Sequence, residues 1–306
     1  MTNSVTNTTL PPQALRAATA PTYRATSLWT MVWRRFRRHK LAMIGVVVLI
    51  FLVLLAIGAP WVARQDPYAV DLRAYRNPPT TGHILGTDSS GRDVFARLLY
   101  GARISLSVGV VAVSVYTALG LILGSLAGYY GGWVDSLLMR LADVVMAFPS
   151  LVLIITIASV VGPSIYNVML VIGWLGWPPI ARIVRGMFLS LRKREFVVAA
   201  QASGVGSPRL IWRHLVPNVL APVIVAATYG MASAILIEAG LSFLGLGVQP
   251  PTASWGNMLN AAQSISILET MPWLWVPPGL MIAITVLSLN FMGDGLRDAL
   301  DPHQSL

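Results

Sequence analysis

Long apolar runs recur along the chain, separated by shorter stretches that hold most of the charged residues. A helix needs about 20 apolar residues to cross the hydrocarbon core of a bilayer. Six runs come close to or exceed this length, at residues 41–63, about 104–129, about 136–161, about 166–183, about 219–241 and about 273–292. The pattern predicts an all-α integral membrane protein with six transmembrane helices and with both termini on the same side.

The segments outside these runs divide the rest of the chain. Residues 1–27 are rich in Thr, Asn, Pro and Ala without an apolar period, which predicts a disordered tail. Residues 28–40 predict an interfacial helix, although a charged flank of the first span is the alternative. Its apolar positions are Leu28, Trp29, Val32, Trp33 and Phe36, and its basic positions on the other face are Arg34, Arg35, Arg37 and Arg38.

The first run, at residues 41–63, is longer than the apolar core of a signal peptide, so we expect it to be retained as an anchor. A polar loop is predicted at residues 64–102. A five-helix core at residues 103–297 and a short tail at residues 298–306 complete the predicted organisation.

The connection between the fourth and fifth runs differs from the apolar segments beside it. Its sequence, EFVVAAQASGVGSPRLIWRHLVPN at residues 195–218, is interrupted at Gly204-Val205-Gly206, and glycine favours helix ends. Ser207 and Pro208 then suit a helix start, because serine can cap free amides and proline lacks a donor that is unpaired there anyway. The pattern predicts two short helices, the second from Pro208 to about residue 216.

Glycine and proline mark special positions inside the runs. Gly120, Gly124 and Gly128 recur every four residues, which predicts a bare helix face for close packing against another helix. Pro178-Pro179 interrupts the fourth run. Such a break is tolerated in a membrane where neighbouring protein satisfies the freed carbonyls, so we expect it to be packed or to line a cavity.

A few charged residues lie close to or inside the apolar runs. Arg140 and Asp143 are three residues apart, and Asp93 and Arg97 are four apart, so each pair is spaced to interact on a helix. Glu238 is the acid deepest in an apolar run, and an acid inside the membrane is a candidate for the translocation path. A role in packing or at a helix end is the equal alternative.

Composition agrees with a membrane protein. The chain is 55% hydrophobic and 11% charged, whereas soluble domains carry about 25% charged residues. Zero cysteines exclude disulfides and thiolate chemistry. The four histidines are scattered without metal-ligand spacing, which argues against a metal site.

The net charge of +10 is explained by topology. With the N-terminus in the cytoplasm, 16 of the 22 Lys and Arg residues fall on the cytoplasmic side, and the other six all fall in the first outer loop. A nucleic-acid partner is therefore unnecessary. The only lysines, Lys40 and Lys193, do not follow glycine in a phosphate-binding loop, so the chain has no P-loop ATP site and no cofactor of its own is expected.

Residues 195–218 resemble the cytoplasmic loop of permease subunits of ATP-binding-cassette importers. The family motif reads Glu-Ala-Ala, three residues, Gly, nine residues, Ile, any residue, Leu-Pro, and its spacing is kept at Ala199, Ala200, Gly204 and Pro217. Three positions depart from the motif: Val198 replaces Glu, His214 replaces Ile, and Val216 replaces Leu. The missing Glu puts one polar contact to the ATPase in doubt.

Further stretches resemble the dipeptide, oligopeptide and nickel group, in its second, C-type permease subunit. These stretches are HILGTDSSGRDVFARLLYGARISL, GYYGGWVDSLLMRLADVVMAFPSLVL, GLSFLGLGVQPPTASWGNML and NFMGDGLRDALDP, and with the loop they span nearly the whole chain. The resemblance implies a type I importer permease fold with cytoplasmic coupling helices, in a bacterial inner membrane. It also implies transport of dipeptides or short oligopeptides, with nickel chelates or glutathione-like peptides as alternatives.

The resemblance implies several partners: a sister permease, two ATPase subunits that bind ATP and Mg, and an extracytoplasmic solute-binding protein. The residues expected to contact the ATPase are Val198, Ala199, Ala200, Ala202, Ser203, Gly204, Val205, Ser207, Arg209 and Pro217. A basic loop lying on lipid is the alternative for this segment. For the whole chain, a stand-alone secondary transporter would show repeats and several midplane charges, and a membrane enzyme would show a clustered catalytic set; neither pattern is visible.

Overall fold

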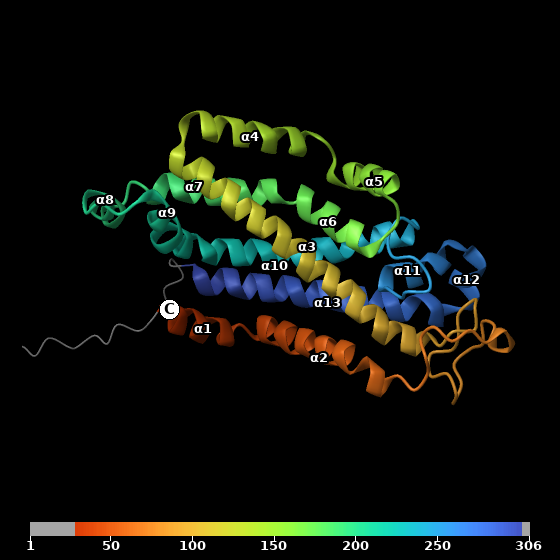
Figure 1. Ribbon diagram of the computed structural model, residues 1–306. Coiled ribbons are helices and arrows are strands. Elements are labelled where there is room, and N and C mark those ends of the chain that lie inside the picture. The colour runs from red at the N-terminus through yellow and green to blue at the C-terminus, as the bar shows by residue number, and fades with distance from the viewer. Residues whose placement is uncertain (1–27, 302–306) are drawn as a thin grey trace, which may run out of the picture.

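The computed structural model describes residues 28–301; the predicted N-terminal tail and residues 302–306 lie outside the described part. Within it, long helices run side by side and no β-strand occurs (Figure 1). The longer elements are α1 (Leu28–Arg38), α2 (Lys40–Val62), α3 (Val94–Tyr130), α4 (Gly132–Ala147), α5 (Ser150–Val161), α6 (Ile165–Leu175), α7 (Trp177–Leu191), α8 (Glu195–Ala202), α10 (Val216–Phe243) and α13 (Pro272–Leu300). Shorter helical segments are η1 (Leu72–Ala74), α9 (Ser207–Arg209), η2 (Leu210–Leu215), α11 (Trp255–Leu259), η3 (Asn260–Gln263) and α12 (Ile265–Thr270).

Five stretches of the described residues are long and apolar enough to cross a membrane as continuous or nearly continuous helices. They are residues 40–62, 94–130, 165–191, 207–243 and 272–300. The sixth predicted crossing corresponds to α4 and α5, which are bent by 85° relative to each other. The prediction of six crossings therefore holds when this bent pair is taken as one broken span.

The bend between α4 and α5 follows from Pro149. Proline cannot donate a backbone hydrogen bond, and it pushes the preceding residue out of the helical region. Phe148 accordingly has an extended backbone, with φ −100° and ψ 143°. The sequence pattern predicted one span at residues 136–161 without this bend, because the apolar run continues across the proline.

The second span begins at Val94, well before the predicted start near Ile104. Asp93 caps the helix, because its side chain accepts a hydrogen bond from the amide of Ala96 at 2.7 Å. The arginines at positions 97 and 103 made residues 94–103 look like loop. At the other end of the chain α13 extends to Leu300, so residues 298–300 are helical rather than part of a tail.

The break in the fourth span is confirmed. α6 ends at Leu175, and α7 begins at Trp177 with the two prolines in its first turn, where a missing donor breaks no hydrogen bond. Trp177 and Pro178 are buried, and Pro179 lines a cavity. The span then continues to Leu191, beyond the predicted end near residue 183.

The two largest of four buried clusters among the described residues hold most of the helices together. The larger joins α3, α6, α7 and α10 and includes Phe188 and Leu215, both 0% exposed. The smaller joins one end of α3 to α11 and α13 around Trp255, also 0% exposed. These clusters leave α8 at one end of the molecule and α11 and α12 at the other (Figure 1).

Candidate coupling and translocation sites

The predicted coupling loop, residues 195–218, protrudes at the end of the bundle where α7 leads into α8 (Figure 1). The helix break expected at Gly204 is present. The amide of Val205 donates to the carbonyl of Ala200 at 3.1 Å, and the amide of Gly204 donates to that of Gln201 at 3.0 Å. This is a Schellman end, and Gly204 adopts the positive φ of 79° that it requires.

One side of α8 rests on the protein and the other faces solvent. Val197 is 0% exposed, and Ala200 and Val205 pack against the larger core cluster. Seven of the predicted contact residues are exposed: Val198, Ala199, Ala202, Ser203, Gly204, Arg209 and Pro217. Ala200, Val205 and Ser207 are half-buried. A bulky residue at position 200 would therefore disturb the packing of α8 against the bundle.

The second short helix predicted from Pro208 does not form as a separate element. Gly206, rather than Ser207, is the N-cap, and the hydroxyl of Tyr129 donates to the Ser207 hydroxyl at 3.0 Å. The helix then passes through a π-helical segment into α10. Pro217 has no backbone N–H to donate. The amide of Val216 donates to the carbonyl of Ile211, five residues back, which is the π-helical pattern. The helix therefore continues through the proline without a break.

The repeated glycines of α3 lie directly against α7. A Cβ atom built on Gly120 would come within 2.6 Å of the Ile180 side chain, and one on Gly124 within 2.5 Å of the Ala181 carbonyl oxygen. A Cβ atom built on Gly128 would come within 2.5 Å of the Phe188 side chain. The two backbones therefore approach more closely than any larger residue would allow.

Two ion pairs tie α4 to α7. Arg185 binds both carboxylate oxygens of Asp135, at 2.5 and 2.6 Å, and Arg182 reaches Asp143 at 2.6 Å. The predicted pair between Arg140 and Asp143 was wrong, because Asp143 faces the arginine of the neighbouring helix. No pattern within one helix could reveal this, since the partner depends on which helix lies alongside α4.

A cavity of about 520 Å³ lies where the irregular parts of the spans meet. Its walls come from α3, α10, the bend between α4 and α5, and the break between α6 and α7. Phe148 and Gly176 contribute at the two irregular points, and most of the lining is apolar apart from Tyr116, Ser150 and Ser233. The volume is in the range of small-molecule sites. Both helix irregularities therefore face one space.

Glu238 lies away from this cavity, near the C-terminal end of α10. It is 0% exposed, and its carboxylate accepts hydrogen bonds from the hydroxyls of Ser242 at 2.7 Å and Ser105 at 3.2 Å. The two hydroxyls in turn accept from the amides of Val248 at 3.1 Å and Trp255 at 3.2 Å. This placement favours the packing alternative for Glu238, because the carboxylate links α3 and α10 to the segment after α10.

We expect Glu238→Ala to lower the thermal unfolding temperature of the purified complex, because the substitution leaves two buried hydroxyls without their acceptor at a cost of about 1–3 kcal/mol each. Glu238→Gln keeps the shape and one acceptor and should unfold closer to the wild type. Uptake per folded complex should be the same for both. A Gln variant of normal stability that fails to transport would instead place Glu238 on the substrate path.

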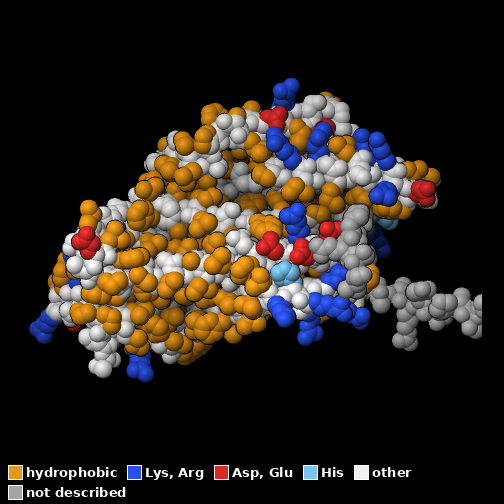
Figure 2. All heavy atoms as spheres, turned by 180° about the vertical axis from the view of Figure 1, so that it is seen from behind, with side chains coloured by type: hydrophobic (Ala, Val, Ile, Leu, Met, Phe, Trp, Pro, Cys, Tyr) orange, Lys and Arg blue, Asp and Glu red, His pale blue; other side chains and the backbone are white. Residues whose placement is uncertain are grey.

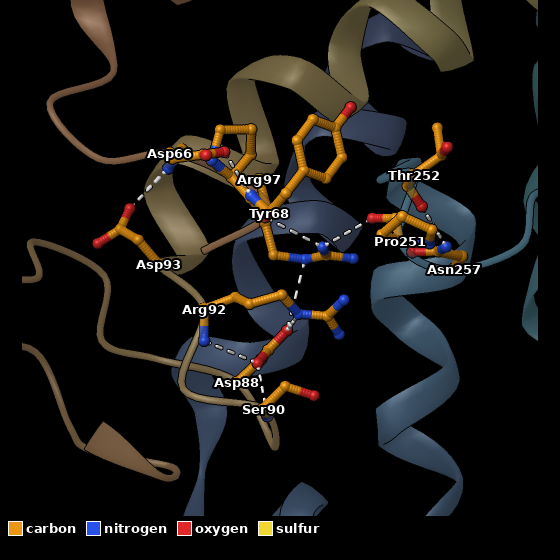
Figure 3. Close-up of polar contacts among 12 residues, drawn as sticks. Asp66, Tyr68, Asp88, Ser90, Arg92, Asp93, Arg97, Pro251, Thr252 and Asn257 are labelled. Carbon is orange, nitrogen blue, oxygen red and sulfur yellow. Dashed lines mark hydrogen bonds and ion pairs between the residues drawn. The ribbon is translucent and has the colours of Figure 1, made fainter. Parts of the chain in front are cut away.

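A polar cluster fixes the loop between α2 and α3 to the segment after α10 (Figure 3). Arg97 is 4% exposed; its guanidinium approaches Asp88 at 3.5 Å and donates to the carbonyls of Pro67 at 3.3 Å and Pro251 at 3.2 Å. The predicted pair between Asp93 and Arg97 was wrong, since Asp93 caps α3 from outside the helix and pairs with His83 at 2.9 Å.

Comparison with known proteins agrees with this architecture. The profile of the family described as "Binding-protein-dependent transport system inner membrane component" matches residues 120–305, more than half of the chain. The chain belongs to this family. The N-terminal part of the permease matches the "N-terminal TM domain of oligopeptide transport permease C" over residues 27–79. The predicted membership among C-type permeases is thus confirmed.

Relatives of the permease match it over about nine-tenths of its length. It is 41% identical over 279 residues to the oligopeptide transport system permease protein OppC of Bacillus subtilis, covering 91% of each chain. It is 42% identical over 280 residues to the dipeptide transport system permease protein DppC of Alkalihalophilus pseudofirmus, covering 92% of this chain and 91% of the relative. It is 44% identical over 275 residues to the glutathione transport system permease protein GsiD of Escherichia coli, covering 90% of each.

A solved structure of the MetNI methionine ABC transporter, in an inward-facing conformation, resembles the permease in fold. The TM-score is 0.53 at 17% identity, and the match covers 67% of this chain and 97% of the other. At this identity the likeness concerns the fold alone. The predicted type I importer permease fold, in a multi-pass inner-membrane protein, is confirmed.

Proposed function

We propose that the permease moves dipeptides or short oligopeptides across the bacterial inner membrane, driven by ATP hydrolysis on partner ATPase subunits. The observation that carries this proposal is the 41–42% identity, over more than nine-tenths of the chain, to permeases named for oligopeptide and dipeptide transport. Glutathione is the second candidate substrate, because the relative from Escherichia coli is named for it. Nickel chelates remain the weaker alternative.

The proposed assembly pairs this chain with a sister permease, two ATPase subunits and a solute-binding protein on the outer face. ATP and Mg belong to the ATPase subunits, and this chain contributes no cofactor site. Both termini face the cytoplasm in this arrangement. It is supported by the basic residues concentrated around residues 182–213, which follow the cytoplasmic preference of Lys and Arg.

The proposed coupling passes from the ATPase through α8 into α7. The exposed face of α8 and its turn dock on the ATPase, and only residues 192–194 separate α8 from α7. α7 begins at the break that lines the 520 Å³ cavity, and its Arg182 and Arg185 hold α4, whose far end forms the other irregular wall. Movement of α8 as a rigid lever would therefore shift two walls of the cavity together.

Uptake in the host tests the proposed function. We expect deletion of the gene to abolish energy-dependent accumulation of labelled dialanine and trialanine, and complementation to restore it. Excess unlabelled glutathione should compete if it shares the pathway. Unchanged peptide uptake in the deletion strain, in cells without a second peptide importer, would contradict the proposal. Loss of glutathione uptake alone would assign the permease to the second candidate substrate.

A further inference from the structure

The segment around α1 carries a concentration of positive charge that the proposed transport does not use. Four arginines and one lysine occur within seven residues: Arg34, Arg35, Arg37, Arg38 and Lys40. No acidic residue precedes Asp66 in the sequence. The cytoplasmic preference of Lys and Arg accounts for the sign of this charge, but it does not require these side chains to bind anything.

α1 is held in a fixed orientation on the bundle. Phe36 is 5% exposed and packs with Ala42 and Ala299. The Arg35 guanidinium donates to the carbonyl of Asp301 at 2.9 Å, and the His39 ring lies 3.5 Å from the carboxylate of Asp298. Val32, Arg35, Phe36 and His39 therefore form the inner face of α1, and Trp33, from the predicted apolar face, lies outside it at 55% exposed.

The outer face of this segment presents the remaining cations. Arg34, Arg37, Arg38 and Lys40 are exposed, and none of them forms an ion pair with a carboxylate within residues 28–301. The Arg37 guanidinium lies 5.9 Å from the ring centre of Trp33. The described part of the protein thus leaves four cations without an anionic partner.

An apolar surface adjoins these cations directly. Leu41 and Ile44, at the start of α2, are 50% and 55% exposed. The space-filling view shows a broad hydrophobic belt with Lys and Arg side chains gathered along its edge (Figure 2). An aromatic side chain, several arginines and an adjoining apolar surface together have the composition of a helix lying at the level of phospholipid headgroups.

We propose that α1 and the start of α2 form a binding surface for the headgroups of anionic phospholipids. Guanidinium groups bind phosphate through two parallel hydrogen bonds, and clusters of four to eight cations beside a transmembrane helix attract anionic lipid. The apolar face of Leu41 and Ile44 accommodates the acyl chains. This inference does not depend on the transported substrate.

Lipid photocrosslinking tests the proposal on the assembled complex in nanodiscs. A photoreactive phosphatidylglycerol should label residues 28–44, and unlabelled phosphatidylglycerol should compete more strongly than phosphatidylcholine. Each arginine near an anionic surface adds to the attraction, so the double variant Arg34→Gln/Arg38→Gln should need roughly thirty-fold more phosphatidylglycerol for half-maximal labelling.

Two further variants make the test specific. Arg34→Lys/Arg38→Lys keeps the charge and should retain most of the binding. Arg64→Gln/Arg73→Gln removes two exposed arginines from the outer loop and should leave labelling of residues 28–44 unchanged. Equal competition by phosphatidylcholine, no shift in the Gln variant, or an equal shift in the outer-loop variant would each overturn the proposal. Circular dichroism and thermal unfolding confirm that the compared complexes are folded.

Discussion

Replacing Gly204 with glutamate is expected to abolish peptide uptake while the permease still inserts into the membrane. Gly204 is exposed, and a side chain there would meet no atom of this chain within 4 Å, so the fold has room for it. Its φ of 79° is strained for other residues, and the added carboxylate would be buried against the proposed ATPase surface. An unpaired charge at such an interface costs about 2–5 kcal/mol, which predicts a loss of roughly thirty-fold or more.

Matched glycine variants separate backbone strain from docking. Gly204→Asn introduces a side chain that tolerates positive φ, and it should keep more uptake than Gly204→Glu. Gly206 is exposed two residues away with φ −65°, so Gly206→Ala should transport normally. Uptake and stimulated ATPase activity are measured in the complemented deletion strain and its membranes. Full activity of Gly204→Glu would mean that this turn does not dock and would favour a loop lying on lipid.

Replacing Gly124 with leucine is expected to prevent assembly of the bundle. A Cβ alone at this position would lie 2.5 Å from the carbonyl oxygen of Ala181, and the backbone cannot yield as a side-chain tip can. Overpacking of a core typically costs about 1–3 kcal/mol, and separation of α3 from α7 adds the loss of the contacts around Gly120 and Gly128. Expression and thermal unfolding in detergent should both fall sharply.

The control for this variant is Gly186→Leu on α7. Gly186 is exposed, and a Cβ there meets nothing within 4 Å, so leucine adds the same volume on the same helix pair without a clash. We expect Gly186→Leu to unfold within a few degrees of the wild type. Similar stability of the two leucine variants would show that α3 and α7 are not held at the close distance that the glycines allow.

The parts of the fold that depend on local chemistry could be predicted from the sequence. The lengths of the apolar runs predicted the number of spans, because a segment that crosses lipid must form its backbone hydrogen bonds within itself and so needs about 20 apolar helical residues. The spacing of Gly120, Gly124 and Gly128 pointed to a close helix contact, and the glycines at positions 204 and 206 pointed to a helix end. Each of these features depends only on residues that are close in the sequence.

The remaining features depend on what lies beside each element. The apolar run hid the bend at Phe148-Pro149, and the arginines at positions 97 and 103 hid the early start of α3, where Arg97 is buried by the outer loop. The partner of Asp143 comes from α7. The cavity arises only where two spans become irregular beside each other, so its residues have no shared sequence pattern.

Crosslinking through a single cysteine at position 203 tests the central claim, that the coupling loop contacts an ATPase. The chain has no cysteine, so Ser203→Cys introduces a unique thiol on the exposed turn. A short reagent with one thiol-reactive end and one photoreactive end, attached to the introduced thiol and activated by light in membranes that contain the complex, should join this chain to a subunit identified by mass spectrometry as a P-loop ATPase. Ser266→Cys, exposed at the opposite end, should not form this product. Crosslinking of the ATPase to position 266, or its absence at 203 when the thiol is reactive, would contradict the account.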